Sequence, residues 1–181
     1  NTIKEQQKRV EIGTVKRQDI LENQAKIVYL GIGSNLGDRK KNIEIAKSYL
    51  NENNLDFLSI SSFYETPSWP DPKKPKFLNI VLEISTNYNP NRLLKILKKI
   101  ETILGRKKRL KNSPRECDID ILDYDNQISK DQTILPHPRM HLRNFVLFPL
   151  FEINKAWKHP KLKHNIKSLI LSLPNRDIRS I

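Results

Sequence analysis

The residues best suited to chemistry are two aspartates, Asp118 and Asp120, which lie one residue apart in the stretch RECDIDIL (115–122). Their neighbours Ile119 and Ile121 are apolar, which predicts a buried β-strand. On a strand, residues i and i+2 point to the same face, so both carboxylates share one face and the two isoleucines the other. Two carboxylates this close repel each other unless a cation bridges them. Oxygen ligands in small number favour Mg²⁺, which shares its coordination shell with substrate phosphates.

A block of six basic residues with no acidic one leads into the aspartates: Arg106, Lys107, Lys108, Arg109, Lys111 and Arg115. Both signs of charge side by side suit a site that holds phosphates through a bridging metal. A loop for nucleic acid would rarely contain carboxylates, because they repel the phosphate backbone. From the residues alone a second interpretation stays open, in which the aspartates lie on a solvated face or pair with these cations.

Composition restricts the class of protein. The 181 residues and 37% hydrophobic content predict one globular domain. The net charge of +13 indicates either a solvated basic surface or a partner, which would be nucleic acid, an anionic lipid surface or a small polyanion such as a nucleotide. The single cysteine, Cys117, excludes an internal disulfide and favours the reducing cytoplasm. We expect its side chain in the core, opposite the aspartates. No apolar run reaches the ~18 residues of a membrane helix.

The pattern of apolar residues predicts the order β-α-β-β-α-β. Strands are expected at 27–32, 56–66, 77–86 and 117–124, and helices at 39–52 and from Asn89-Pro90 to Gly105. Residues 67–76 and 134–143 are proline-marked loops, residues 144–153 a further helix or strand, and 165–172 a last helix. This order is the ferredoxin-like split βαβ pattern, an α+β sandwich whose antiparallel sheet carries helices on one face. We expect a domain over 25–181, preceded by a polar extension over 1–24.

Three segments outside the aspartate strand could also contribute to a site. His137 lies between two prolines, which favours a fixed orientation, although a loop histidine is most often a surface residue. Trp69 stands in a proline-rich loop, where an exposed indole needs a partner. The stretch GIGSNLG (31–37) contains glycines but lacks the lysine of a P-loop and the full dinucleotide fingerprint, so both of those motifs are rejected.

Several segments, taken in order, resemble the 6-hydroxymethyl-7,8-dihydropterin pyrophosphokinases of folate biosynthesis. They are YLGIGSNLGD, SSFYETPSW, FLNIVLEI, LGRKKRLKNSPRECDIDIL and ILPHPRMHLRNFVLFPLFEI, which together extend over about residues 26–173. The resemblance implies a ferredoxin-like α+β fold. It also implies transfer of pyrophosphate from ATP to the pterin hydroxymethyl group, with release of AMP and with two Mg²⁺ ions.

The resemblance assigns roles to individual residues. Asp118 and Asp120 would bind both Mg²⁺ ions, and Arg106 and Arg115 would act with them in catalysis. The ATP site would consist of Glu101, Arg106, Lys108, Arg109, Arg115, Ile121 through its backbone, His137 and Arg143. The pterin would lie against Gly33, Thr66, Pro67, Ser68, Trp69, Phe77, Asn79 and Phe145. The loops 68–76 and 106–116 would close over the substrates and exclude water.

The chain departs from the family pattern in two loops, and two other functions remain alternatives. Asn112 and Ser113 stand where relatives carry a bulky residue and a glycine, which leaves the register of Lys108 and Arg109 open by one position, and Pro70 replaces a common glycine. A basic RNA-binding module is one alternative, although such modules place aromatic residues where this strand has acids. A catalytically inactive scaffold is the other. The extension 1–24 is either a linker from a fused folate-pathway enzyme or a tail of this chain alone.

Overall fold

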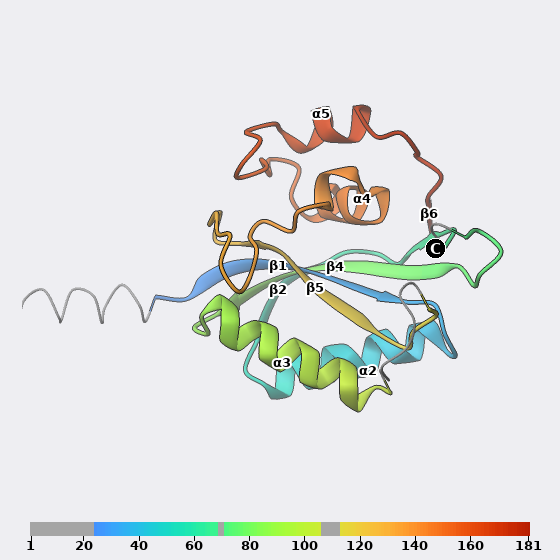
Figure 1. The fold of residues 1–181 in the computed structure, drawn as a ribbon, viewed down its shortest axis with the longest axis horizontal. Helices are drawn as coiled ribbons and strands as arrows, with labels where there is room; N and C mark the ends of the chain where they lie inside the picture. The colour runs from blue at the N-terminus through green and yellow to red at the C-terminus, as the bar shows by residue number, and fades with distance from the viewer. Residues whose placement is uncertain (1–23, 69–70, 106–112) are drawn as a thin grey trace, which may run out of the picture.

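The computed structural model describes residues 24–68, 71–105 and 113–181 (Figure 1). The predicted extension over 1–24 therefore falls almost wholly outside the described residues, as do Trp69, Arg106, Lys108 and Arg109. The elements in chain order are β1 (Lys26–Ser34), α2 (Arg39–Glu52), β2 (Asp56–Ile60), β3 (Tyr64–Thr66), β4 (Phe77–Thr86), α3 (Pro90–Ile103), β5 (Asp118–Tyr124), the 3-10 helix η1 (Met140–Leu142), α4 (Asn144–Ile153), α5 (Ile166–Leu171) and β6 (Arg179–Ser180). The predicted order β-α-β-β-α-β is confirmed from β1 to β5 except that its second strand is divided into β2 and β3.

The described strands form one antiparallel sheet in the order β5-β1-β4-β3-β6, and β2 pairs with β4 beside β3. β1 pairs with β4 along its full length and with β5 from Val28 to Gly33, so it is the strand that both halves of the sheet share. The paired register runs from Lys26 opposite Thr86 to Ser34 opposite Leu78. The α+β sheet predicted from the sequence is thereby confirmed, with β6 as an addition from the end of the chain.

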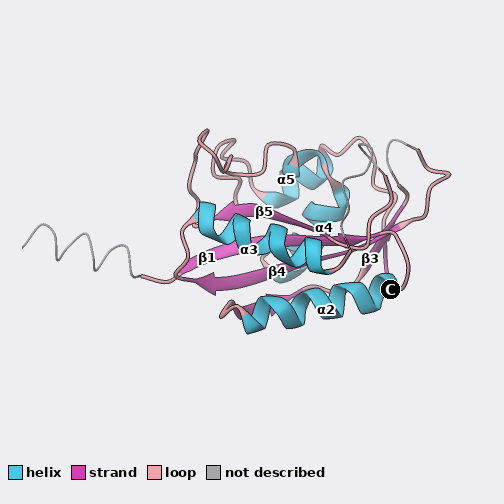
Figure 2. Cartoon of the chain, turned by 60° about the horizontal axis from the view of Figure 1, so that its bottom comes forward, coloured by secondary structure: helices cyan, strands magenta, loops and turns pink. Residues whose placement is uncertain are grey.

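Helices α2 and α3 lie side by side beneath one face of this sheet (Figures 1 and 2). Asp38 caps α2 by accepting a hydrogen bond from the Lys41 amide at 3.0 Å, and Asn89 caps α3, with Pro90 in its first turn. Each helix buries one apolar stripe against the sheet, and Cys117, fully buried, belongs to the same core as predicted. The sequence periodicity therefore fixes this layer.

The opposite face of the sheet is also covered, which corrects the prediction of helices on one face only. α4 and α5 lie over it (Figure 1), and a second core of Tyr29, Val81, Leu122, Met140, Val146, Leu147, Leu150, Trp157, Ile166, Leu169 and Leu173 fills the space between. Val81 sits in the middle of β4 and is completely buried, so this face cannot face water. Both faces are closed over the centre of the sheet, and the described helices include none that is both apolar and long enough to cross a bilayer.

The single strand predicted over 56–66 is instead two strands, β2 and β3, with a break at Ser61. The Ser61 hydroxyl accepts a hydrogen bond from the Val81 amide at 2.9 Å, a position that a backbone carbonyl would occupy in a regular ladder. Beyond the break, Glu152 of α4 accepts from the Ser62 amide at 3.0 Å and from the Tyr64 hydroxyl at 2.8 Å. Side chains thus replace the ladder here and connect α4 to the sheet.

Candidate active site

Asp118 and Asp120 lie on the face of β5 that is directed away from α2 and α3, as the alternation predicts. Their side chains are 28% and 32% exposed, whereas the intervening Ile119 is completely buried in the core beneath. β1 places Gly33 opposite Asp118 and Gly31 opposite Asp120. Because neither glycine has a side chain, the Asn79 amide and the Leu122 side chain can approach β1 closely beside the two carboxylates.

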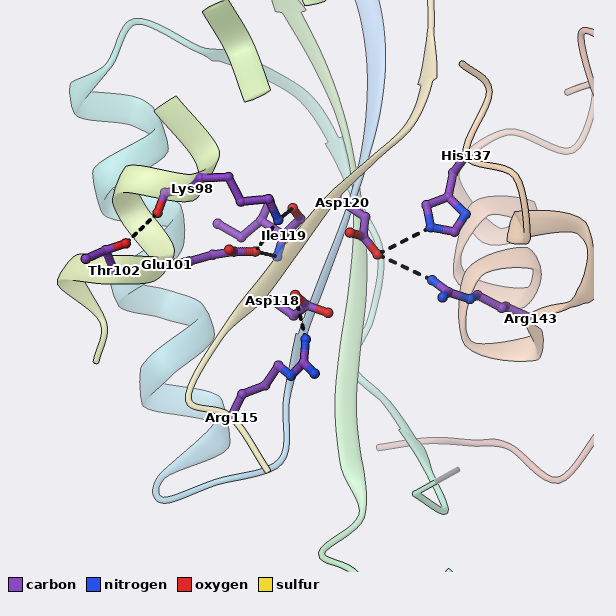
Figure 3. A network of polar contacts seen from close by, with 9 residues as sticks. All are labelled: Lys98, Glu101, Thr102, Arg115, Asp118, Ile119, Asp120, His137 and Arg143. Atoms are coloured by element: carbon purple, nitrogen blue, oxygen red, sulfur yellow. Dashed lines mark hydrogen bonds and ion pairs between the residues drawn. The ribbon is translucent and has the colours of Figure 1, made fainter. Parts of the chain in front are cut away.

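Each aspartate is paired with an arginine from a different segment (Figure 3). Arg115, three residues before β5, places its NH1 atom 3.1 Å from Oδ1 of Asp118. Arg143, at the start of α4, places its NH1 atom 3.3 Å from Oδ2 of Asp120. Both guanidinium groups are only partly exposed, so the two carboxylates lie between two fixed cations. A polyanion bound here would meet positive charge on either side.

His137 occupies the remaining side of Asp120, with its Nε2 atom 3.8 Å from Oδ2. Its backbone amide donates to the Leu122 carbonyl at 2.8 Å, and its Nδ1 atom accepts from the Arg139 amide at 3.1 Å. Because Nδ1 is an acceptor, the neutral ring carries its proton on Nε2, the atom directed at the site. Burial and the positive charge of Arg143 lower the pKa of His137 despite the nearby carboxylate. The imidazole is therefore a neutral donor at pH 7.

The donor set of this cluster suits a hard divalent cation whose remaining ligands come from elsewhere. Asp118 and Asp120 offer carboxylate oxygens only, on one face and partly open to solvent. Among the described residues, no group of three or more histidine, cysteine or acidic side chains is arranged to hold a metal ion. Two carboxylates without a third ligand match Mg²⁺ that is shared with phosphates better than a structural zinc site.

A second group of predicted residues lies on the same face of the sheet, one strand further across. β4 places Asn79 opposite Gly33 on one side and opposite Tyr64 of β3 on the other. Asn79 is 5% exposed, and its Nδ2 atom donates to the Thr66 hydroxyl at 3.2 Å. A Cβ atom at Gly33 would lie 2.8 Å from the Asn79 Oδ1 atom, closer than the pair could tolerate. Gly33 is therefore required for this placement of the Asn79 amide.

The other predicted pterin residues come from the elements around Asn79. Phe77 is paired with Thr66 at the start of β4, and Ser68, which is buried, and Pro67 follow β3 directly. Phe145 lies in the first turn of α4, and the Arg143 guanidinium is 5.4 Å from the centre of its ring. That contact connects Phe145 to the aspartate group, because Arg143 is paired with Asp120. An amide, hydroxyls and aromatic rings beside a carboxylate pair could hold a flat heterocycle next to a phosphate chain.

Two predicted ATP residues have side chains directed away from the open face. The Ile121 side chain lies in the core beneath α2 and α3, so only its backbone can reach a ligand. Glu101 of α3 is completely buried, and its Oε1 atom accepts from the Ile119 amide at 2.7 Å and from Lys98 at 2.9 Å. Burial raises the pKa of Glu101, and the Lys98 ammonium opposes that effect. Contact of Glu101 with ATP stays a prediction.

Asn35 is a residue of this region that sequence reasoning missed. It is 2% exposed. Its side-chain Oδ1 atom accepts from the Arg115 backbone amide at 2.9 Å, and its backbone amide donates to the Arg115 carbonyl at 3.1 Å. Its Nδ2 atom donates to the Pro75 carbonyl at 3.2 Å. Asn35 therefore joins the end of the basic loop to the end of the proline-rich loop. The motif GSNLG contained this signal, since a buried asparagine in a turn commonly bonds neighbouring backbone.

Comparison with known proteins gives one consistent family. The family model of 7,8-dihydro-6-hydroxymethylpterin-pyrophosphokinase (HPPK) matches residues 29–155, which include β1, β5 and α4. A 2-amino-4-hydroxy-6-hydroxymethyldihydropteridine pyrophosphokinase of Aquifex aeolicus is 41% identical over 77% of this chain and 88% of its own length. The protein of the same name from Bacillus subtilis is 40% identical over 70% of this chain and 77% of its own length.

Longer proteins contain a similar unit as one part. The folic acid synthesis protein FOL1 of Dictyostelium discoideum is 40% identical over 82% of this chain, which spans only 23% of that protein. Among solved structures, wild-type HPPK-DHPS of Plasmodium falciparum has a TM-score of 0.62 at 15% identity, with 81% of this chain and 44% of that chain aligned. At this identity the likeness shows the fold alone.

Proposed function

Because the chain belongs to the 7,8-dihydro-6-hydroxymethylpterin-pyrophosphokinase family, we propose that it transfers the pyrophosphoryl group of ATP to 6-hydroxymethyl-7,8-dihydropterin in folate biosynthesis. The pterin hydroxymethyl oxygen forms a bond to the β-phosphorus, the bridge between the α- and β-phosphorus breaks on its β side, and AMP leaves. The hydroxyl proton is released to solvent. The observation that carries the proposal is the position of the Asp118–Asp120 pair on the same sheet face as the Asn79–Thr66 pair, with only Gly33 between them on β1.

In this proposal Asp118 and Asp120 hold Mg²⁺, and two ions are expected. Mg²⁺ held by these carboxylates would neutralise charge on the phosphates. Arg115 and Arg143, now paired with the carboxylates, are close enough to exchange part of that contact for phosphate oxygens. His137 is proposed to donate a hydrogen bond from Nε2 to a phosphate oxygen while its ring stays neutral. Arg106, Lys108 and Arg109 are proposed to contribute further cations from outside the described residues.

The pterin is proposed to bind against Asn79 and Thr66, with Phe77 and Phe145 on its faces. The buried amide and hydroxyl favour a ring that carries matching donors and acceptors, because a wrong ring would leave them unpaired. Gly33, Pro67, Ser68 and Trp69 are proposed to complete the pocket. Glu101 and the backbone of Ile121 are retained as proposed parts of the ATP side.

The test is AMP formation from ATP, Mg²⁺ and hydroxymethyl-dihydropterin, followed by chromatography, with each component omitted in turn. AMP is expected only in the complete mixture and in a 1:1 ratio with the pterin diphosphate. A folded protein that binds both substrates and forms no AMP would support the inactive scaffold instead. The RNA-binding alternative is disfavoured, because among the described residues helices cover the centre of both sheet faces, and the part that stays exposed on β5 carries the acids Asp118 and Asp120.

We also propose that residues 25–181 form the whole catalytic unit and that the reaction takes place in the cytoplasm. The family match begins at residue 29, inside β1, which supports a unit without the extension. A variant that begins at residue 25 should therefore retain AMP formation. If the extension is instead a linker of a fused folate enzyme, its removal still leaves this step intact.

A further inference from the structure

The strand that carries the aspartates lies at an edge of the described sheet. An edge strand leaves every second residue with an outward N–H and C=O that no strand satisfies. At Ile119, between the two aspartates, helix α3 contacts both of these groups (Figure 3). Glu101 Oε1 accepts from the Ile119 amide at 2.7 Å, and Lys98 Nζ lies 3.4 Å from the Ile119 carbonyl oxygen. The two side chains therefore contact the groups that a neighbouring strand would bond.

Burying this carboxylate is expensive, which argues that the contact is more than incidental. Glu101 is 0% exposed, and a buried charge is strongly unfavourable unless it is paired and hydrogen-bonded. Lys98 provides the pairing through Nζ at 2.9 Å from the same Oε1 atom, while its own side chain remains 44% exposed. An apolar residue at 101 would continue the stripe of α3 at lower cost, but it would leave the Ile119 amide without its acceptor.

The geometry around Ile119 holds three consecutive backbone units from two sides. Asp118 and Asp120 are paired with Gly33 and Gly31 of β1, on the inner side of β5. Ile119 is held on the outer side by α3. Figure 3 shows Glu101 on one side of β5 and the side chains of Asp118 and Asp120 directed to the other side. The spacing and direction of the two carboxylates therefore depend on both contacts.

We propose that Glu101, supported by Lys98, is a positioning residue that fixes Ile119 and thereby the metal-binding geometry of Asp118 and Asp120. It acts through the strand, so this role does not depend on the contact between Glu101 and ATP that is proposed above. This inference rests on the proposed function, because it assumes that the two aspartates hold Mg²⁺ with ATP. Residues one step removed from a metal commonly change its affinity 10–100-fold, because ligands must stay within about 0.5 Å of their working positions.

Two conservative substitutions separate reach from charge. Glu101→Gln retains the length of the side chain and an oxygen that can accept from the Ile119 amide, but it removes the charge. Glu101→Asp retains the charge, but it is one methylene shorter and cannot span 2.7 Å to the strand from the same backbone position. Thr102→Ala is the matched control, because its hydroxyl donates to the Lys98 carbonyl within α3 at 2.9 Å and, within the described part of the chain, to no group of β5.

The first measurement is amide hydrogen exchange at Ile119 by NMR, which needs neither metal nor substrate. The second is the affinity for Mg²⁺ with α,β-methylene-ATP, an unreactive analogue, by calorimetry. Glu101→Asp should speed exchange at Ile119 at least 10-fold and weaken the nucleotide affinity about 10-fold. Glu101→Gln should remain within three-fold of the parent on both, and Thr102→Ala within two-fold. Pterin affinity should stay within two-fold throughout.

Three results would overturn the proposal. In the first, Glu101→Asp matches the parent while Glu101→Gln is impaired, which assigns the role to charge or direct nucleotide contact. In the second, both variants are equally impaired. In the third, exchange at Ile119 rises while the nucleotide affinity does not change. If Glu101→Asp does not fold, Glu101→Gln alone still decides, since the proposal requires it to retain both properties. Failure of the proposed function is separate: the parent protein would then form no AMP, whatever Ile119 does.

Discussion

Gly33→Ala is expected to weaken pterin binding by about 10- to 100-fold while leaving ATP binding nearly unchanged. A Cβ at residue 33 would lie 2.8 Å from Asn79 Oδ1, whereas ordinary contact begins at 3.4 Å, so the amide must move by 3.4 − 2.8 = 0.6 Å. A shift of that size directed away from β1 pushes the amide toward Thr66 on β3, well inside the 3.2 Å of their hydrogen bond, so the amide must rotate out of that bond. One lost internal bond and one misplaced ligand bond cost about 1–1.5 kcal/mol each, and each 1.4 kcal/mol is tenfold in affinity.

The measurement is calorimetric titration of hydroxymethyl-dihydropterin in the presence of Mg²⁺ and α,β-methylene-ATP, with ATP-analogue affinity measured separately. Gly31→Ala is the matched control: it adds the same methyl group to the same strand and face, but its Cβ meets only the flexible Leu122 side chain at 3.4 Å. Its pterin affinity should stay within about two-fold, since the extra contact is one a side chain accommodates. Undiminished pterin affinity in Gly33→Ala, or an equal loss for both ligands, would show that the Asn79 amide does not select the pterin.

Asp118→Asn and Asp120→Asn should each lower AMP formation more than about 10³-fold. Each should change the free energy of unfolding by less than about 1 kcal/mol, because both ion pairs are partly exposed. Activity with a normal Mg²⁺ requirement in both variants would refute the metal assignment. Asn35→Asp retains an oxygen that accepts from the Arg115 amide, but it sets a carboxylate oxygen against the Pro75 carbonyl, so KM for the pterin should rise about 10-fold. An unchanged KM would mean that the contact with Pro75 does not order the proline-rich loop. Burial lowers the pKa of His159 from 6.5 to about 4, so the folded state resists protonation and stability falls as pH drops from about 6.5 to 4. His159→Asn should flatten this fall in urea unfolding by up to ~3 kcal/mol, and identical slopes for parent and variant would refute it.

The sequence was sufficient for features that depend on local periodicity. The alternation around Asp118 and Asp120 determined which face they share, because the side-chain period of a strand is two and needs no tertiary information. The caps Asp38 and Asn89 and the apolar stripe of α3 located the two helices beneath the sheet in the same way. For these elements, the structure that the local sequence favours is the one that the whole fold adopts.

Features that depend on side chains replacing backbone could not be predicted. The break at Ser61 arises because a hydroxyl satisfies the Val81 amide, and nothing in SISS (59–62) distinguishes this from a continuous strand. The partners of Asp120 are Arg143 and His137, 23 and 17 residues away along the chain, and no local pattern links them. The role of Glu101 at Ile119 was hidden for the same reason, since a charged residue beside an apolar helical stripe ordinarily faces solvent.

The third acid of this strand shows how one irregularity separates chemistry from structure. Strict alternation would place Asp123 on the face opposite Asp118 and Asp120, among the residues beneath α2 and α3. The register of β1 against β5 instead shifts between Tyr29 and Leu30, so Leu122 is an extra residue and Asp123 turns to the α4–α5 face.

There the Asp123 carboxylate accepts from Trp157 Nε1 at 2.8 Å and from the Asn126 amide at 3.1 Å, at 1% exposure, and burial raises its pKa. It is therefore satisfied by protein donors and closed to a metal, although it shares a face with the open pair. Because of the bulge, the carboxylates of Asp118 and Asp120 reach solvent and that of Asp123 does not. The strand accordingly presents two partly exposed carboxylates and no more, a number that would leave a divalent cation, as proposed, dependent on its substrate's phosphates.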